Sequence, residues 1–513
     1  MYNLSLVGPG WCVVERQTSW KLQSTSLLPL NVIESPLNTS FVLAITALLT
    51  LPLILAARKL VTARCHLRDF PGPSWAAYTR LWLCKTLASG NSAQIFVNIN
   101  HTHGSIARVG PNHLVTSDPD FTRQILAVGT TWRSAPSYDA LRIDPRMSNI
   151  VSERDARVHN AMRRRMAPGY AGKDIQGLED AVDERIGAFI SRIEKHWVSD
   201  AGMTESFDIA KRIQFFTLDT IAHLCFGKPL GFVESDLDKH NFIATLEEQL
   251  PFFTVFSGYT DTEPGAEMDC CGALGKKARR ALLGRQARHR YHYEGKYASL
   301  LAKNEKPQPD MLGSFLKHGL GPDEAEMEMS ITLIAGSDTT ATALRATLLS
   351  IISTPTVYQR LINEIDAAEA KGRISHPVSN GEAQKLPYLQ AVIREGLRRF
   401  PPVTQLRERE APPEGLQLPD GRRIPGGTFV GLNAWGTQLN PVFGADAHVF
   451  RPERWLPESY DDDDDDDGGQ RLAAMSKVHE LIFGHGMTRC LGISIAMMNI
   501  NKMLVEVSFV PAV

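Results

Sequence analysis

The stretch Phe483-Gly484-His485-Gly486-Met487-Thr488-Arg489-Cys490-Leu491-Gly492 decides how the rest of this chain is read. It places one cysteine at the end of a glycine-rich loop, directly before an apolar pattern with helical spacing from Leu491 to Val510. A thiolate there is stabilised by the helix dipole and by free backbone N–H groups, and glycines let a flat ligand approach the backbone. The loop therefore predicts a cysteine that ligates haem iron. The alternative is an inert, buried cysteine beside an ordinary loop.

Composition narrows the class of protein. The 513 residues are 43% hydrophobic and 22% charged, as in globular proteins, and a net charge of −2 gives no case for a nucleic-acid partner. The cysteines contain no C-x-x-C spacing, so neither a disulfide framework nor a zinc site is favoured. We therefore expect most of the chain to lie in a reducing compartment.

A membrane anchor is predicted near the N-terminus. Residues 41–57 form an uncharged run whose length is at the short end of what spans a bilayer. The basic residues Arg58, Lys59, Arg64 and Arg68 follow it, and such residues favour the cytosolic side. We expect a single-pass helix in the endoplasmic reticulum membrane, with residues 1–40 lumenal and the remainder cytosolic. With this anchor, the sequons at Asn3 and Asn38 would be lumenal. A cleaved signal peptide is the alternative to the anchor.

After the anchor, the pattern predicts one large domain that is mainly α with small β-sheets. Phe70-Pro71-Gly72-Pro73 is typical of a stiff hinge. Helical periodicity is strongest in Ile175 to Val198, Phe207 to Cys225, Ala325 to Ile352 and Pro355 to Ala370, and short strands are expected near 105–109 and 423–432. The run Asp461 to Asp467 indicates a solvated insertion, since it lacks the spaced ligands of a calcium site.

A second motif, Ala335-Gly336-Ser337-Asp338-Thr339-Thr340, lies inside one predicted helix. Polar residues and a glycine are unfavourable there, and they offer a place where the backbone ladder can open. Asp338 and Thr339 would supply a carboxylate and a hydroxyl for proton transfer. The alternative is hydroxyls bonded back to their own helix.

A third motif, Glu395-Gly396-Leu397-Arg398, puts an acid and a base three residues apart on one helical face. Arg454, in Phe450-Arg451-Pro452-Glu453-Arg454-Trp455, could join them in a buried network. Burying such a network removes its charged groups from water, which costs free energy, but the network can hold the packed segments in a single arrangement. We expect this set to be structural and to hold the segment before Cys490.

In their order, these motifs resemble the cytochrome P450 superfamily, over Phe70 to about Val510. Ala335 through Leu349 and Phe400 through Thr404 are similar to the pisatin-demethylase-like enzymes of fungal secondary metabolism. The resemblance implies haem b as cofactor, with Cys490 as the axial iron ligand.

The resemblance also implies roles for residues other than the cysteine. Asp338 and Thr339 would be the proton-delivery pair, with Gly336 at the helix opening. His159 and Arg163 fall where members of the family bind a haem propionate. Basic side chains suit this carboxylate because they can form charge-assisted hydrogen bonds with it.

Further cofactor contacts are implied around the cysteine loop. Arg409 falls at a second propionate position, and Phe483 and Gly486 would shape the loop against the cofactor. The family usually has a basic residue two before the cysteine, but Thr488 stands there. Arg489 either supplies that contact from a shifted angle or the loop lacks it.

The C-terminal end departs from the family, which continues past this helix into a β-hairpin lining the substrate pocket. Only 513 − 490 = 23 residues follow Cys490, so we expect pocket closure to differ. Substrate contacts are expected within 132–158 and 240–310, and Pro251-Phe252-Phe253-Thr254-Val255-Phe256 would roof the pocket or meet the bilayer.

The resemblance implies a haem-thiolate monooxygenase that inserts one oxygen atom of O2 into an apolar small molecule. No G-x-G-x-x-G fingerprint is present, so electrons from NADPH would arrive through a separate NADPH–cytochrome P450 reductase. One alternative is a haem-thiolate isomerase or dehydratase, which has less need of the Asp338–Thr339 pair. Another is a truncated, inactive haem-binding protein.

Overall fold

The structure is a computed structural model that describes residues 64–144, 146–197, 208–257, 308–457 and 467–508, with isolated positions between 46 and 61. Contacts divide the chain into two units, Met1–Lys59 and Leu60–Val513. Most of the predicted anchor lies outside the described residues, as do both sequons, residues 461–466 and residues 509–513. No helix among the residues that are described is long and apolar enough to cross a bilayer.

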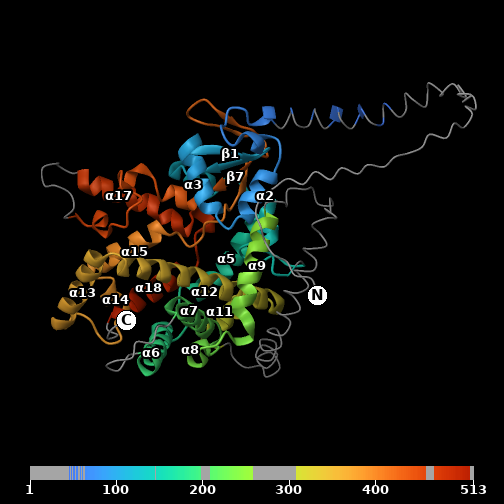
Figure 1. The fold of residues 1–513 in the computed structure, drawn as a ribbon. Coiled ribbons are helices and arrows are strands. Elements are labelled where there is room, and N and C mark those ends of the chain that lie inside the picture. The colour runs from blue at the N-terminus through green and yellow to red at the C-terminus, as the bar shows by residue number, and fades with distance from the viewer. Residues whose placement is uncertain are drawn as a thin grey trace, which may run out of the picture. The chain divides into compact units, whose positions relative to one another are not determined.

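The second unit contains a mixed five-stranded sheet and a separate two-stranded ribbon (Figure 1). The sheet order is β1-β2-β7-β4-β3; β2 and β7 are parallel, and the other neighbours are antiparallel. Its strands are β1 (Ile106–Gly110), β2 (His113–Thr116), β3 (Arg133–Ser134), β4 (Arg409–Glu410) and β7 (Phe429–Leu432). The ribbon pairs β5 (Leu416–Gln417) with β6 (Arg423–Ile424). The strands expected near 105–109 and 423–432 are confirmed.

Helices form the larger part of the fold. Those before residue 258 are α2 (Leu81–Ala88), α3 (Ser92–His103), α4 (Pro119–Leu126), α5 (Ala156–Tyr170), α6 (Leu178–His196), α7 (Ile209–Phe226), α8 (Phe232–Ser235) and α9 (Phe242–Ser257). The later ones are α11 (Met311–Lys317), α12 (Pro322–Ile352), α13 (Pro355–Ala370), α14 (Asn380–Ala383), α15 (Pro387–Arg399), α16 (Ala434–Thr437), α17 (Asp467–His479) and α18 (Ile493–Ser508). The prediction of a mainly α fold with small sheets is therefore confirmed.

Capping residues set where the helices of the site begin. The Asp155 side chain accepts hydrogen bonds from two backbone N–H groups at the start of α5, and the Asp208 side chain accepts one, from the Lys211 N–H, at the start of α7. Pro322 takes the first position of α12, where a missing N–H costs nothing, and Glu324 bonds back to the Gly321 N–H. These caps fix the register of the helices that carry the site residues.

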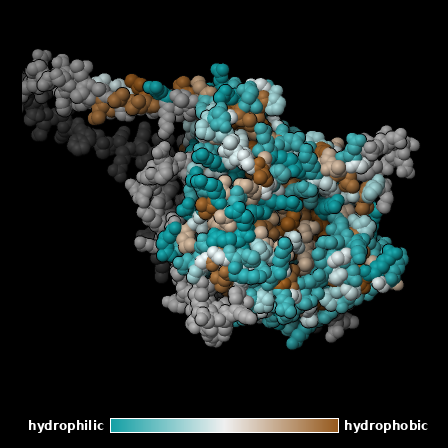
Figure 2. All heavy atoms as spheres, turned by 180° about the vertical axis from the view of Figure 1, so that it is seen from behind, coloured by the Kyte–Doolittle hydropathy of each residue, from teal (hydrophilic) through white to brown (hydrophobic). Residues whose placement is uncertain are grey.

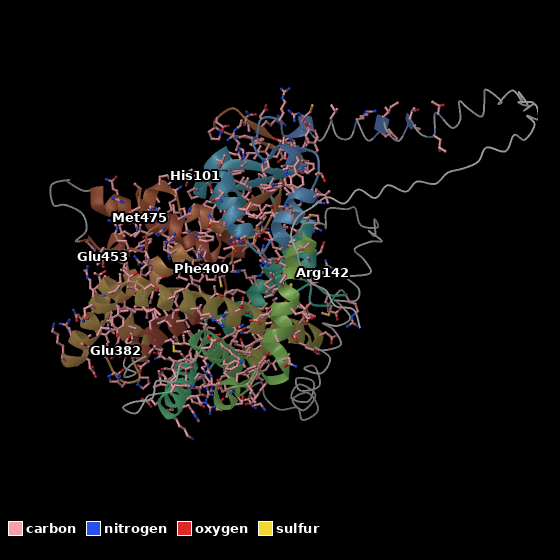
Figure 3. All side chains as sticks on the ribbon, in the orientation of Figure 1. His101, Arg142, Glu382, Phe400, Glu453 and Met475 are labelled. Carbon is pink, nitrogen blue, oxygen red and sulfur yellow. The ribbon has the colours of Figure 1, made fainter. Side chains whose placement is uncertain are left out.

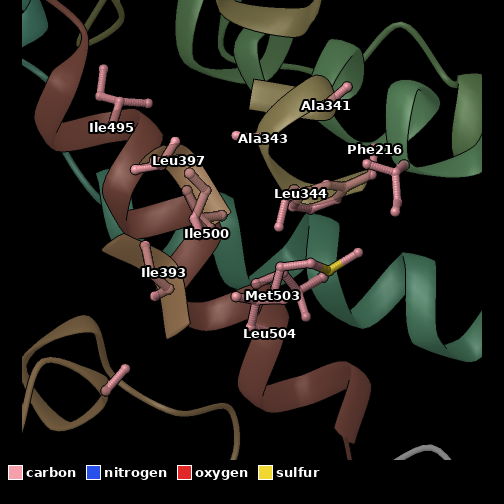
Figure 4. Packing of buried hydrophobic residues seen from close by; sticks show 14 of the residues in the cluster. Phe216, Ala341, Ala343, Leu344, Ile393, Leu397, Ile495, Ile500, Met503 and Leu504 are labelled. Atoms are coloured by element: carbon pink, nitrogen blue, oxygen red, sulfur yellow. The ribbon is translucent and has the colours of Figure 1, made fainter. Parts of the chain in front are cut away.

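The helical core packs around α12. Figure 4 shows Leu344 of α12 and Phe216 of α7 close to Met503 and Leu504 of α18, all almost fully buried. Gly336 is required at the contact between α12 and α7, because a Cβ there would lie 2.9 Å from the Ile221 side chain. The exterior is different: the face seen in Figure 2 is mostly hydrophilic, with hydrophobic residues gathered near its middle.

The predicted buried network is present. Glu395, Arg398 and Arg454 are fully buried, and both arginines bind the Glu395 carboxylate, at 2.8 and 3.0 Å for their closest contacts. Trp455 Nε1 also donates to Glu395, at 2.9 Å. The Trp455 ring in turn meets His479 edge-on, with ring centroids 5.2 Å apart. The network thus reaches the end of α17, which leads into the cysteine loop.

Candidate haem-binding site

One large cavity brings the separated motifs together. Its volume is about 1100 Å³, and residues of α5, α12, the segment 403–414 and the cysteine loop line it. The helix η2 (Pro136–Leu141) forms part of the wall and packs against α9; Arg142, which follows η2, lies beside α9 in Figure 3. Thr254 of α9 also accepts a hydrogen bond from Gln405, a lining residue. These contacts place α9, which contains residues 251–256, against the pocket wall. The side chains of Phe252, Phe253 and Phe256 lie outside the described residues, so their predicted role over the pocket stays a prediction.

Cys490 opens onto this cavity. Its backbone N–H donates to the Phe483 carbonyl at 2.8 Å, which closes the loop into a rigid turn. Gly484 has a φ of 76°, and a Cβ there would lie 2.9 Å from the Thr488 carbonyl oxygen. Enclosure by the protein raises the pKa of the Cys490 thiol, while the Gly492 backbone N–H and nearby arginines oppose this rise. The loop therefore presents the sulfur on a fixed backbone, three residues before α18.

Two loop residues have roles other than the predicted ones. Phe483 packs against the helical core and contributes its carbonyl, but it does not line the cavity. Gly486 does not line it either: at a φ of 57°, a Cβ at Gly486 would lie 2.0 Å from the Leu126 carbonyl. This glycine is needed for the close approach of the loop to the end of α4. The role of Gly486 in cofactor binding stays a prediction.

The predicted cationic residues do converge on the cavity. His159 and Arg163, one turn apart on α5, both line it, as do Arg409 and Arg489. Burial, followed by the charge of Arg163, lowers the pKa of His159, so its imidazole is neutral near pH 7. Arg409 donates to the Ser134 hydroxyl and lies 5.2 Å from the centroid of the Tyr138 ring. Three arginines therefore face the space in front of the cysteine.

The motif on α12 divides between the cavity and the helix packing. Thr339 lines the cavity, and its hydroxyl donates to the Ala335 carbonyl at 2.8 Å. Asp338 is not a lining residue; burial raises its pKa, and the charge of Arg345 opposes this. α12 is helical throughout, so the opening expected at Gly336 is not seen as a break.

Sequence reasoning missed two lining features. Arg407 lies in the cavity wall two residues before Arg409. The charged run Arg407-Glu408-Arg409 was the available signal in the sequence. Glu408 lies 3.8 Å from His113. The second feature is a hydrogen bond of 2.7 Å between the hydroxyls of Tyr170 and Thr332, which no sequence pattern indicated.

These residues fit haem b. Its iron requires an axial donor, which Cys490 would supply, and its two carboxylates require cations on the cavity wall. Arg407 and Arg409 support this fit, because the Nε of each has no hydrogen-bond partner among the described residues. The donor, the cations and the volume are all present in one cavity.

The comparisons agree with this geometry. The sequence profile of the cytochrome P450 family matches residues 70–507. This chain belongs to the cytochrome P450 family. It is 35% identical over 479 residues to the cytochrome P450 monooxygenase ABA1 of Pyricularia oryzae, with 90% of each chain covered.

Two further relatives are also fungal monooxygenases. The cytochrome P450 monooxygenase abl1 of Leptosphaeria maculans is 31% identical, over 87% of this chain and 77% of the relative. The cytochrome P450 monooxygenase gsfF of Penicillium aethiopicum is 28% identical, over 85% and 86%. The chain is thus a P450 of the fungal secondary-metabolism type, a monooxygenase with haem b as cofactor.

Proposed function

We propose that this P450 inserts one oxygen atom of O2 into an apolar secondary-metabolite intermediate, using two electrons from NADPH delivered by NADPH–cytochrome P450 reductase. The other oxygen atom leaves as water, so each turnover consumes two protons. We also propose that residues 41–57 anchor the enzyme in the endoplasmic reticulum membrane with its P450 domain in the cytosol, since basic residues follow this run. The observation that carries the reaction is the shared cavity of Cys490 and Thr339.

The cavity wall supports an apolar substrate. Its lining includes large apolar side chains from four separate segments: Trp132, Leu141, Ile150, Ile221, Val403 and Leu432. Such surfaces bind by excluding water, and a few polar groups then fix orientation.

The residues of the chain divide the chemistry among them. Haem, when bound, supplies O2 activation, and the thiolate of Cys490 donates electron density to its iron. The Thr339 hydroxyl proton is held by the Ala335 carbonyl, so the oxygen of that hydroxyl can accept a hydrogen bond from a group in the cavity. The raised pKa of Asp338, adjacent in sequence, suits it to pass protons toward Thr339.

Metabolite comparison tests the reaction. Fungal hosts with and without this gene should differ in an oxidised product whose added oxygen derives from labelled O2. The C490S variant should abolish that product while the protein accumulates normally, because a serine oxygen cannot replace the thiolate. Persistence of the product in C490S would contradict the proposed chemistry.

Replacing Thr339 tests proton delivery separately. With reductase and the substrate found above, T339A should lower the product formed per NADPH consumed by at least about tenfold, because proton transfer fails while electron transfer continues. The T339S variant keeps the hydroxyl and should retain most of the coupling. Equal coupling in T339A and the wild type would exclude Thr339 from this role.

An isomerase or dehydratase needs no such coupling. If product formed without reductase and NADPH, that alternative would replace the monooxygenase proposal.

A further inference from the structure

Arg407 is a charged side chain enclosed in the cavity wall without a carboxylate partner among the described residues. Its Nε makes no hydrogen bond in the described structure. Burial lowers its pKa, and the other charges that act on it come from Tyr138, Arg409 and Cys490. A guanidinium stays charged at any physiological pH, so the chain itself leaves this cation uncompensated.

The position of Arg407 indicates which anion compensates it. A Cβ built on Gly484 would lie 3.6 Å from a terminal nitrogen of Arg407, so the guanidinium reaches the cysteine loop. The side chain thus extends from the segment before β4 to the side of the cavity where Cys490 lies. An anion bound there must itself contact the cysteine loop.

The backbone holds Arg407 in an uncommon conformation. Its φ is 41°, and few non-glycine residues adopt positive values because of steric cost. Such strain persists where the surrounding structure over-determines the residue, commonly at ligand sites. The Glu408 carboxylate lies 3.8 Å from His113 Nε2.

The cysteine loop lacks the cation that the family places two residues before the cysteine. Thr488 stands there; its hydroxyl donates to the His485 carbonyl at 3.2 Å, and it carries no charge. Arg489 also lines the cavity but comes one residue later. A cation from another segment can fill the missing position if it reaches the same loop, and Arg407 does.

We propose that Arg407 binds a haem carboxylate, replacing in this chain the basic residue absent at position 488. The guanidinium fork suits a carboxylate, and the contact is formed from the opposite wall of the cavity. This inference rests on the haem cofactor of the family and not on the substrate or reaction proposed above.

Haem dissociation measures this contact without reference to turnover. Ferric wild-type protein and R407Q would be mixed with excess apomyoglobin, and haem transfer followed by absorbance. The R407Q protein should lose haem at least about tenfold faster, as expected for one charge-assisted hydrogen bond. Both proteins would then be reconstituted with haem dimethyl ester, which has no carboxylates. With this cofactor the two dissociation rates should agree.

Two further variants serve as controls. R157Q removes an arginine from the same cavity whose side chain is 95% exposed, and its dissociation rate should match the wild type. In R407Q/T488R the family's usual cation is restored, and haem should again be held more tightly than in R407Q. If R407Q does not fold, R407K keeps the charge but loses the fork, and should still release haem faster than the wild type.

An equal rate of haem loss in wild type and R407Q would overturn the proposal. Binding of dodecanoic acid and dodecanol, measured by the spectral shift of the haem, then decides between two explanations. The first result is equal binding of both ligands by wild type and R407Q, which leaves Arg407 without a carboxylate partner. The second is weaker binding of dodecanoic acid, but not of dodecanol, by R407Q. That second result would assign Arg407 to a carboxylate on the substrate.

Discussion

Two buried arginine clusters in this protein differ in whether the chain supplies their counter-charge. Around Glu395, the guanidinium groups of Arg398 and Arg454 are satisfied by the carboxylates of Glu395 and Asp446 and by several carbonyls, including those of Gln438 and Ala447. Around Cys490, Arg163, Arg407 and Arg489 face a cavity to which the chain brings no paired carboxylate among its described residues. The charges of the first cluster are balanced within the chain, and we propose that the carboxylates of the cofactor balance those of the second.

The comparison separates structural from functional charge. A buried ion pair is destabilising to break, because the remaining charge is left unsolvated. An arginine cannot relieve burial by losing its proton, so an anion bound in the cavity would stabilise these arginines. Haem b meets this need with two carboxylates. On this proposal, arginine stabilises the fold in one cluster and binds the cofactor in the other.

Glu328 shows how an unpaired acid resolves the same problem. It is 1% exposed, accepts a hydrogen bond from the Ile150 N–H at 2.8 Å, and its second oxygen has no partner among the described residues. Burial raises the pKa of Glu328 to about 8. The acid can become neutral by taking up a proton, whereas an arginine cannot become neutral by losing one.

The largest expected effect comes from breaking the complete cluster. E395Q leaves the buried Arg398 without a counter-charge and Arg454 with Asp446 alone, so we expect unfolding to become easier by roughly 3–5 kcal/mol. Urea unfolding followed by circular dichroism, together with the yield of folded protein, measures this. The control E369Q removes an acid that is 49% exposed and paired with His376, and should change stability by less than about 1 kcal/mol. A small effect for E395Q would remove the distinction between the clusters.

A smaller effect is expected from the pH dependence of Glu328. Its pKa in the folded state lies above its ordinary value, so the folded state binds the extra proton and stability falls as pH rises toward about 8. Between pH 6 and pH 8 the wild type should lose about 2 kcal/mol more than E328Q, which keeps the acceptor for Ile150 but cannot ionise. Thermal unfolding midpoints at the two pH values measure the difference. Identical pH profiles would show that Glu328 is not held as an acid.

Much of this arrangement could be predicted from the sequence, because local patterns carried it. The Cys490 loop and the helical spacing of Glu395 and Arg398 are short-range features, and the joining of Arg454 to that pair followed from its charge. The convergence of His159 and Arg163 with Cys490 in one cavity was also expected. Each of these predictions needs only spacing or the family order of motifs.

The remainder depends on contacts between distant segments. Gly486 is required because Leu126, far away in sequence, approaches its backbone, and no local pattern shows that. The reach of Arg407 to Gly484 likewise depends on how β4 and the cysteine loop meet. Asp338 was placed correctly on the site helix, but helix packing turns it out of the cavity wall.

The central claim is that the arginine-lined cavity holds haem through the thiolate of Cys490. The absorption spectrum of the reduced, carbon-monoxide-treated protein tests it most directly, with C490S measured in parallel. We predict that the wild type shows the long-wavelength Soret band typical of thiolate-ligated haem, and that C490S lacks it. A wild-type spectrum without that band, or the same band in C490S, would contradict the account.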